Sequence, residues 1–169
     1  TEADADAGGF LDCFSLTAAD LPVVIAPGQR VLKNPSLAQM ADDLGMTETF
    51  DHAAVFDLAV VGAGPAGLAA AVYGASEGLQ TIVLESLAPG GQAGTSSKIE
   101  NYLGFPTGIS GQALAGRALA QAEKFGAKLA VARGAVKLHC EGRGLIGVEL
   151  AGGQTVRARA VVIATGAQY

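Results

Sequence analysis

Three glycines stand where an apolar run gives way to an alanine-rich one, and their types and spacing could bind phosphate: Gly62, Gly64 and Gly67. Residues 57–61 have the composition of a buried strand and 65–76 that of a helix. In a strand-to-helix turn, G-x-G-x-x-G spacing has physical meaning. The first glycine permits the tight turn, the second leaves room for a phosphate, and the third lets the helix pack on the strand. We therefore expect a nucleotide pyrophosphate at the helix N-terminus, on its free N–H groups.

An acidic residue, Glu85, ends the next apolar run, 80–85. It lies 23 residues after Gly62. In dinucleotide-binding folds an acidic residue follows the glycine motif by about 20 residues, so the spacing agrees. A carboxylate there accepts hydrogen bonds from a ribose 2′-OH and repels a 2′-phosphate, so it favours FAD or NAD over NADP. The alternative remains that the glycines only pack a strand against a helix, without a ligand.

A long irregular stretch, 86–110, follows this strand and is rich in glycine and in amide and hydroxyl side chains. Loops of this length inside a compact domain are usually functional. Amide and hydroxyl groups suit a polar ring such as the flavin pyrimidine. A mobile, solvated loop is the alternative interpretation.

The remaining apolar runs predict an α/β domain with a Rossmann-like parallel sheet and a three-stranded antiparallel meander. We expect a helix from 110 to 125, capped by Ser110 and ended by Gly126. The expected strands are 128–132 in the parallel sheet, 135–140, 145–150 and 155–158 in the meander, and a buried final strand at 160–164. Because ligands bind beyond the carboxyl ends of such strands, Thr165 and Gly166 should reach the same crevice as the glycine turn.

The N-terminal part of the chain differs in charge and pattern from the rest. Residues 1–51 hold nine acidic and two basic residues, whereas 52–169 hold seven acidic and nine basic ones. We expect an acidic tail, a β-hairpin from strands at 21–25 and 30–32, and a helix that runs from about residue 36 to 44. The predicted domains are therefore 1–51 and 52–169.

Composition argues against several classes of function. The net charge of −5 disfavours nucleic acid or an anionic membrane as the main partner. No apolar run approaches the roughly 18 residues of a membrane span. Cys13 and Cys140 lie far apart, without the spacing of metal ligands, and we expect two reduced thiols in a cytoplasmic protein without a metal site.

Five motifs occur in the order seen in the FAD domain of thioredoxin reductase-like flavoproteins of the low-molecular-weight bacterial type. They are Gly62–Gly67, Glu85, Pro89–Gln92, Ile99–Pro106 and Ala164–Ala167. The resemblance spans about 55–169. The loop motif from Gly90 to Pro106, with Thr95-Ser96-Ser97, further resembles a subgroup in which a cyclic-nucleotide-binding domain and a thioredoxin-like segment precede the reductase.

The hairpin and helix of the N-terminal part resemble the C-terminal half of a thioredoxin-like domain. In that family a cis-proline precedes the third strand, and Pro22 is the matching position. A generic hairpin–helix linker is the alternative, because topology inferred from so short a segment is weakly determined.

The resemblance implies a set of FAD contacts, namely Gly62, Gly64, Pro65, Ala66, Gly67, Glu85, Gly91, Gln92, Asn101, Val136, Thr165 and Gly166. The residues of the glycine turn hold the pyrophosphate, and Glu85 binds the adenosine ribose. Gly91 and Gln92 approach the ribityl and flavin region, Asn101 contacts the isoalloxazine and Val136 lies near the adenine. Thr165 and Gly166 close the site.

The resemblance also implies an activity for the complete protein. Hydride passes from NADPH through FAD to a disulfide or another acceptor, such as thioredoxin or a fused thioredoxin-like domain, in a homodimer. This chain shows no second dinucleotide motif and no C-x-x-C, so we predict no catalytic residue in it and expect an incomplete, inactive FAD-binding segment. The alternative function is a stand-alone FAD- or NAD-binding or redox-sensing module.

Overall fold

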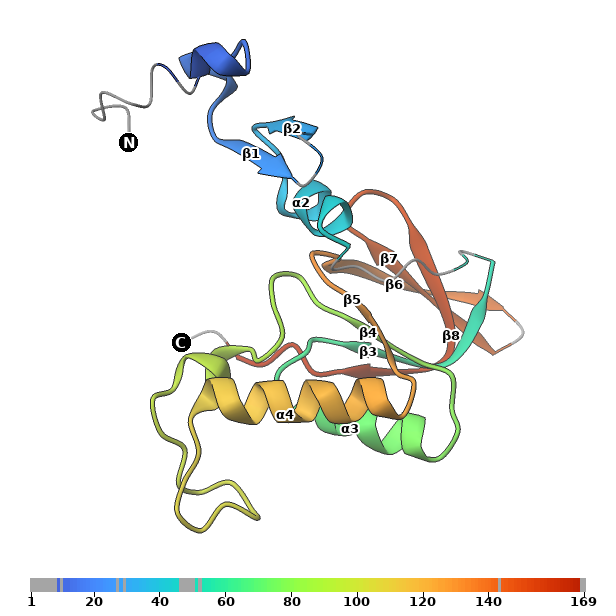
Figure 1. The fold of residues 1–169 in the computed structure, drawn as a ribbon. Helices are drawn as coiled ribbons and strands as arrows, with labels where there is room; N and C mark the ends of the chain where they lie inside the picture. Colours follow the sequence, from blue (N-terminus) through green and yellow to red (C-terminus); the bar gives the residue numbers. More distant parts are fainter. Residues whose placement is uncertain are drawn as a thin grey trace. The chain divides into compact units, whose positions relative to one another are not determined.

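The computed structural model describes residue 9 and residues 11–26, 28, 30–45, 51, 53–142 and 144–167. The chain divides into two compact units, Thr1–Met46 and Thr47–Tyr169 (Figure 1). The acidic tail that the sequence predicts falls at 1–8, outside the described residues.

The first unit contains a β-hairpin and a short helix. Its elements are η1 (Ala18–Asp20), β1 (Val23–Ala26), β2 (Arg30–Lys33) and α2 (Leu37–Asp43). The two strands pair antiparallel, so the predicted hairpin is confirmed, with its first strand shifted by two residues at its start. Ser36 caps α2 by accepting a hydrogen bond from the Gln39 N–H at 3.2 Å, as the serine before an apolar helix predicts. The Leu21–Pro22 peptide bond is cis, as the resemblance implies.

The second unit is built on one mixed six-stranded sheet. Its elements are β3 (Val55–Val61), α3 (Pro65–Ser76), β4 (Thr81–Leu84), η2 (Gln92–Thr95), α4 (Gly111–Lys124), β5 (Lys128–Ala130), β6 (Ala135–Gly142), β7 (Leu145–Leu150) and β8 (Thr155–Ile163). The strand order is β5-β4-β3-β8-β7-β6. Strands β5, β4, β3 and β8 run parallel, and β8, β7 and β6 form the antiparallel meander. The predicted fold class is therefore confirmed.

Helices and meander cover opposite faces of the parallel strands (Figure 1). On one face Leu58 and Val60 of β3 pack with Leu68 of α3 and with Ala122 of α4. On the other face, Ala59, Val61, Ile82 and Leu84 form a second core with residues of the meander, namely Val148, Leu150 and Val156. The central strands are apolar on both sides because both sides are covered.

The last strand of the sheet corrects the prediction in two ways. Residues 155–158 and 160–164 were expected as separate strands, but β8 is continuous from Thr155 to Ile163. It changes partners along its length, since it pairs with β7 up to Ala158 and with β3 through Ile163. The expectation of a buried strand is also wrong, because Val162 and Ile163 are 36% and 63% exposed. Beyond Ala158, the pairings of the described residues cover only one edge of β8.

The pairing register brings three strand ends to one place. Val61, the last residue of β3, pairs with Leu84 at the end of β4 and with Ile163 at the end of β8. All three strands are parallel, so their carboxyl ends lie at the same edge of the sheet. The segments that follow these strands must therefore meet, which is where this class of sheet binds ligands.

Candidate functional site

A cavity of about 1050 Å³ lies at the carboxyl ends of β3, β4 and β8. Most of the residues predicted to contact the cofactor line it: Gly62, Gly64, Pro65, Ala66, Glu85, Gly91, Gln92, Thr165 and Gly166. They come from three segments, 62–66, 85–92 and 165–166, which together span more than a hundred residues of sequence. The parallel sheet is what brings them together.

The first and third glycines of the turn are sites of close backbone packing. Gly62 has φ of +102°, and a Cβ atom on it would lie 2.4 Å from the carbonyl oxygen of Ala164. A Cβ atom on Gly67 would lie 1.9 Å from the carbonyl oxygen of Gly62. Neither position has room for a side chain. Gly67 packs against the turn and is not among the residues that line the cavity.

The second glycine is different, because it faces open space. Gly64 has an ordinary backbone conformation, with φ of −72°, and a Cβ atom on it would find its nearest neighbour, the Gly91 Cα, at 3.9 Å. Gly64 lines the cavity, so the absence of a side chain there leaves the space that a ligand would occupy. This is the observation expected where a phosphate approaches the backbone.

The N-terminus of α3 also faces the cavity. Gly64 is the N-cap residue and supplies no side-chain hydrogen bond, and Pro65 and Ala66 line the cavity beside it. The N–H groups of the first helical turn have no intrahelical acceptor, and the helix dipole places positive potential at this end. The site therefore fits the negative charge of a pyrophosphate.

The loop that follows β4 approaches the glycine turn through its backbone. The Gly90 N–H donates to the carbonyl oxygen of Ala63 at 2.8 Å. Gly91, with φ of +53°, lies so close that a Cβ atom on it would be 3.1 Å from the Gly64 Cα. The side chain of Gln92 donates to the carbonyl oxygen of Ala167 and so links this loop to the segment after β8. These contacts fix one wall of the cavity.

Glu85 lies in the wall of the cavity and is only 8% exposed. Its Oε2 accepts a hydrogen bond from the Ala63 N–H at 2.7 Å. Its Oε1 accepts from the Leu87 N–H at 2.9 Å and from the Ser86 hydroxyl at 3.3 Å. The sequence predicted the position of this carboxylate but not its hydrogen bond to Ala63 in the glycine turn.

Two other predicted contacts lie away from the cavity wall. Asn101 is exposed in the loop that the bridge between Ile99 and Ile109 closes at its base. Val136 is 62% exposed, although its neighbours Gly134 and Ala135 line the cavity. Both residues remain predictions as cofactor contacts.

One helix face that the sequence analysis missed completes the lining. The residues on it, Gln112, Ala115, Gly116 and Leu119 of α4, recur at i, i+3, i+4 and i+7. This spacing marks one face of a helix and was therefore visible in the sequence. A second apolar stripe of the same helix consists of Leu114, Ala118 and Ala122. Leu114 and Ala122 are buried, and Ala118 packs against the core. The two stripes give α4 a core face and a cavity face.

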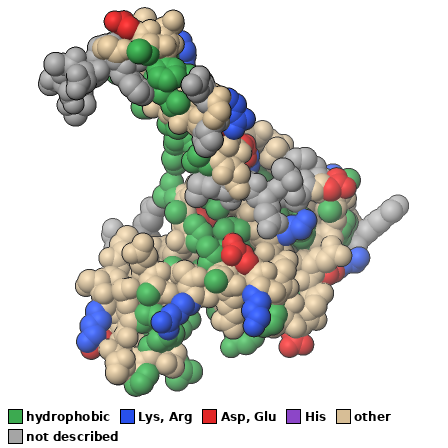
Figure 2. Space-filling model, viewed as in Figure 1, with side chains coloured by type: hydrophobic (Ala, Val, Ile, Leu, Met, Phe, Trp, Pro, Cys, Tyr) green, Lys and Arg blue, Asp and Glu red, His purple; other side chains and the backbone are tan. Residues whose placement is uncertain are grey.

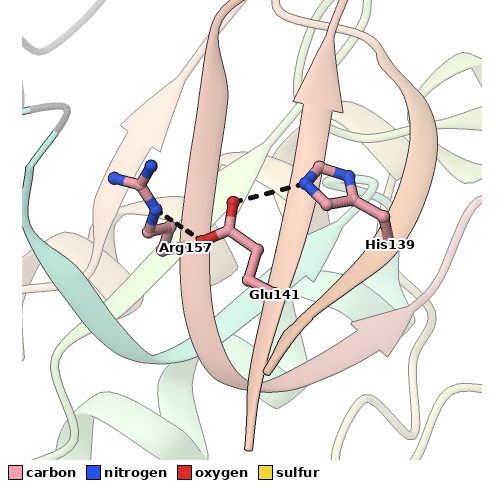
Figure 3. Close-up of polar contacts among 3 residues, drawn as sticks. All are labelled: His139, Glu141 and Arg157. Carbon is pink, nitrogen blue, oxygen red and sulfur yellow. Dashed lines mark hydrogen bonds and ion pairs between the residues drawn. The ribbon is translucent and has the colours of Figure 1, made fainter. Parts of the chain in front are cut away.

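A polar cluster lies on the outer side of the meander, among residues that do not line the cavity (Figure 3). Glu141 Oε2 accepts from Arg157 Nε at 2.6 Å, and Glu141 Oε1 lies 3.3 Å from His139 Nε2. Gly147 of β7 lies between the partners, and a Cβ atom on it would be 2.4 Å from His139 Nε2. The hydrogen bond from Arg157 lowers the pKa of Glu141 below its ordinary value of 4.5. The cluster therefore joins β6 to β8 across β7.

Other features of the described part of the chain bear on alternative functions. On the face drawn in Figure 2, acidic and basic side chains are interspersed, without a large area of one sign. Within the described ranges, no helix is long and apolar enough to cross a membrane. The same residues include no group of three or more His, Cys, Asp or Glu that could hold a metal ion. Cys13 and Cys140 are free and exposed.

Known proteins share this arrangement of sequence and structure. The family described as pyridine nucleotide-disulphide oxidoreductase matches residues 56–169. Thioredoxin reductase of Bacillus subtilis (strain 168) is 41% identical over 115 residues, which cover 68% of this chain and 35% of that protein. The chain thus spans about a third of the length of this relative.

Solved structures give the same result. Thioredoxin reductase from Streptococcus pyogenes MGAS5005 superposes with a TM-score of 0.64 at 36% identity, over 69% of this chain and 37% of that one. A thioredoxin reductase from Gloeobacter violaceus gives a TM-score of 0.60 at 34% identity, over 67% and 35% of the two chains.

The family match and the cavity involve the same part of the chain. The matched residues, 56–169, contain the glycine turn, Glu85 and the segment after β8, which together line the cavity. The match covers well over half of the sequence. The chain therefore belongs to the pyridine nucleotide-disulphide oxidoreductase family, as a thioredoxin reductase-like member.

Proposed function

We propose that residues 52–169 form the first FAD-binding segment of an NAD(P)H-dependent flavoprotein oxidoreductase. One observation carries the proposal. The N-terminus of α3 begins at Gly64, which leaves open space where a side chain would stand. The buried carboxylate of Glu85 lines the same cavity. A nucleotide needs both features, an anion site for the pyrophosphate and an acceptor for the ribose hydroxyls.

The predicted contact residues divide the binding of FAD among them. Gly62, Gly64, Pro65, Ala66 and Gly67 form or support the turn that holds the pyrophosphate. Glu85 accepts from the adenosine ribose, and Val136 lies toward the adenine. Gly91, Gln92 and Asn101 belong to the loops that approach the ribityl chain and the flavin. Thr165 and Gly166, which follow β8, close the site.

Bound FAD would supply a two-electron acceptor and donor, and this segment would hold it. The complete protein would oxidise NADPH and reduce a disulfide or another acceptor. Thioredoxin or a fused thioredoxin-like domain would be that acceptor. The printed names of the relatives support this activity, since they are thioredoxin reductases. We also propose that the complete protein is cytoplasmic, in keeping with two free cysteines, and that it is a homodimer, as the resemblance implies.

The N-terminal unit fits the same proposal. We assign residues 1–51 to an acidic tail and a partial thioredoxin-like segment, as in the subgroup fused to a cyclic-nucleotide-binding domain. The order of hairpin and helix in the described residues supports this assignment. The longer sequence of the protein would test it, because a C-x-x-C belongs in the half that precedes this segment.

Reconstitution tests the cofactor assignment directly. The full 169-residue chain is titrated with FAD and with NAD by calorimetry, and the flavin absorption spectrum is recorded after removal of free ligand. We expect FAD to bind with a perturbed visible spectrum, and NADPH to be oxidised no faster than by free FAD. A preference for NAD would favour a stand-alone sensing module, and the absence of a bound flavin band at saturation would refute the assignment.

A further inference from the structure

The carboxylate of Glu85 connects two segments that lie 22 residues apart. It follows β4 and is 8% exposed, yet its Oε2 accepts from the N–H of Ala63, inside the glycine turn, at 2.7 Å. Ala63 itself is fully buried, at 0% exposed. A carboxylate needed only to bind a ribose would require no hydrogen bond to the turn.

Both polar groups of Ala63 are held by the same loop. Its N–H donates to the Glu85 side chain, and its carbonyl oxygen accepts from the Gly90 N–H at 2.8 Å. Gly62, the preceding residue, has φ of +102° and can adopt many other conformations. The two hydrogen bonds of Ala63 therefore restrict the turn at the residue between its first two glycines.

The chemistry of a carboxylate suits this contact. A buried N–H group must find an acceptor, and hydrogen bonds to a charged acceptor are shorter and stronger than neutral ones. Oε1 serves the Leu87 N–H and the Ser86 hydroxyl, and Oε2 serves Ala63. Each carboxylate oxygen can accept about two hydrogen bonds. Oε2 thus keeps capacity for a ligand hydroxyl while it holds the turn.

We propose that Glu85 is a positioning residue, whose carboxylate holds the glycine turn in its binding shape before the nucleotide arrives. This inference rests on the proposed function in one respect, that the turn is the phosphate site. The carboxylate then acts twice, since it preorganises the pyrophosphate site and also accepts from the ribose. Preorganisation raises affinity because the ordering cost is met during folding.

Two substitutions separate this function from a simple ribose contact. Glu85→Gln keeps the size of the side chain but replaces one of the two oxygens by an NH2 group. Either the N–H of Ala63 or that of Leu87 therefore loses its acceptor. Glu85→Asp keeps the charge and both oxygens but is one methylene shorter. It can serve the nearby Leu87 N–H and loses the longer reach to Ala63. Glu123→Gln, an exposed change on α4, is the matched control.

The measurements use the full chain without FAD, followed by FAD titration. We expect Glu85→Gln and Glu85→Asp to lower the Tm of the FAD-free chain by about 3–10 °C, since a buried donor loses its acceptor. Amide exchange at Ala63 should accelerate by about 5- to 150-fold in Glu85→Asp, and both variants should bind FAD more weakly. Glu123→Gln should change none of these. An unchanged Tm and unchanged exchange at Ala63, with weaker FAD binding, would overturn the proposal.

A measurement on the unmodified chain covers the case in which the variants do not fold. An N–H that donates to a carboxylate shows a scalar coupling to the carboxyl carbon through the hydrogen bond. NMR of the FAD-free chain should therefore show this coupling between the Ala63 nitrogen and the Glu85 carboxyl carbon, and its absence would overturn the proposal. If the chain binds no FAD, the proposed function fails, whereas the Ala63 data still decide whether Glu85 holds the turn.

Discussion

Gly64 and Gly67 are three residues apart in the same motif, but an added methyl group meets different surroundings at each. At Gly67 the new Cβ atom would lie 1.9 Å from the carbonyl oxygen of Gly62 and 3.3 Å from Val60 Cγ1. At Gly64 the nearest atom would be 3.9 Å away, and the backbone conformation suits any residue. The two alanine variants should therefore fail in different ways.

The expected magnitudes follow from these contacts. Gly67→Ala forces the turn and α3 apart, and overpacking of this kind costs about 1–3 kcal/mol of the free energy of unfolding. We expect the upper end, because the opposing atom belongs to the backbone. Gly64→Ala should change the free energy of unfolding by less than about 1 kcal/mol. Its methyl group stands where the phosphate approaches, and the loss of one charged hydrogen bond weakens FAD binding by about 10- to 150-fold.

Urea denaturation of the FAD-free chain and calorimetric titration with FAD measure the two effects separately. Each variant is the control for the other, because both add one methyl group to the same turn. The reasoning is refuted if Gly64→Ala binds FAD as tightly as the unmodified chain. It is equally refuted if Gly67→Ala unfolds at the same urea concentration as the unmodified chain.

Three further substitutions test contacts outside the turn. Ser110→Ala removes the side-chain oxygen that caps α4 and should lower the free energy of unfolding by about 1 kcal/mol in urea. Leu68→Ala empties a fully buried position beneath α3 and should lower it by about 2–5 kcal/mol. Glu141→Gln removes the negative charge that pairs with Arg157, whose hydrogen bond lowers the pKa of Glu141 in the folded chain. The ion pair therefore stabilises the folded chain above pH 4.5, and this stabilisation is lost as the pH falls through the folded pKa. The Tm difference between the variant and the unmodified chain should be seen at neutral pH and should narrow below pH 4.5.

Exposed residues of the same types serve as controls for these substitutions. Leu103→Ala changes a side chain that is 96% exposed, and a loss as large as that of Leu68→Ala would contradict the packing argument. Ser97→Ala, in the exposed loop, should leave the urea midpoint unchanged. For Glu141, a Tm difference that stays constant from neutral to acidic pH would show that the ion pair is not its cause.

Most elements of the second unit could be predicted because their signals are local. The strand, glycine turn and helix at 57–76 depend on apolar runs and on the conformations that glycine allows. Ser110 accepts from the Ala113 N–H at 3.2 Å, and Gly126 adopts φ of +89° after α4. Capping and chain reversal depend on a few neighbouring residues, so they can be predicted from the sequence.

The errors concern interactions between distant parts of the chain. The break expected near residue 159 does not exist, because β8 exchanges its partner β7 for β3 without leaving the extended conformation. The exposure of Ile163 was also missed. Hydrophobicity shows that a residue can be buried, whereas burial depends on whether another segment covers it.

The sequence by itself determined the glycine turn, the acidic residue that follows the second strand, and the apolar pattern of the sheet. Only the tertiary structure decided that Glu85 accepts from Ala63, that α4 lines the cavity, and that the backbone packed against Gly62 belongs to Ala164. The reason is physical. Motif spacing records the shape of one short stretch of backbone, but the atoms that contact it come from elsewhere in the chain. Glu85 lies 22 residues from Ala63, and Ala164 lies more than a hundred residues from Gly62.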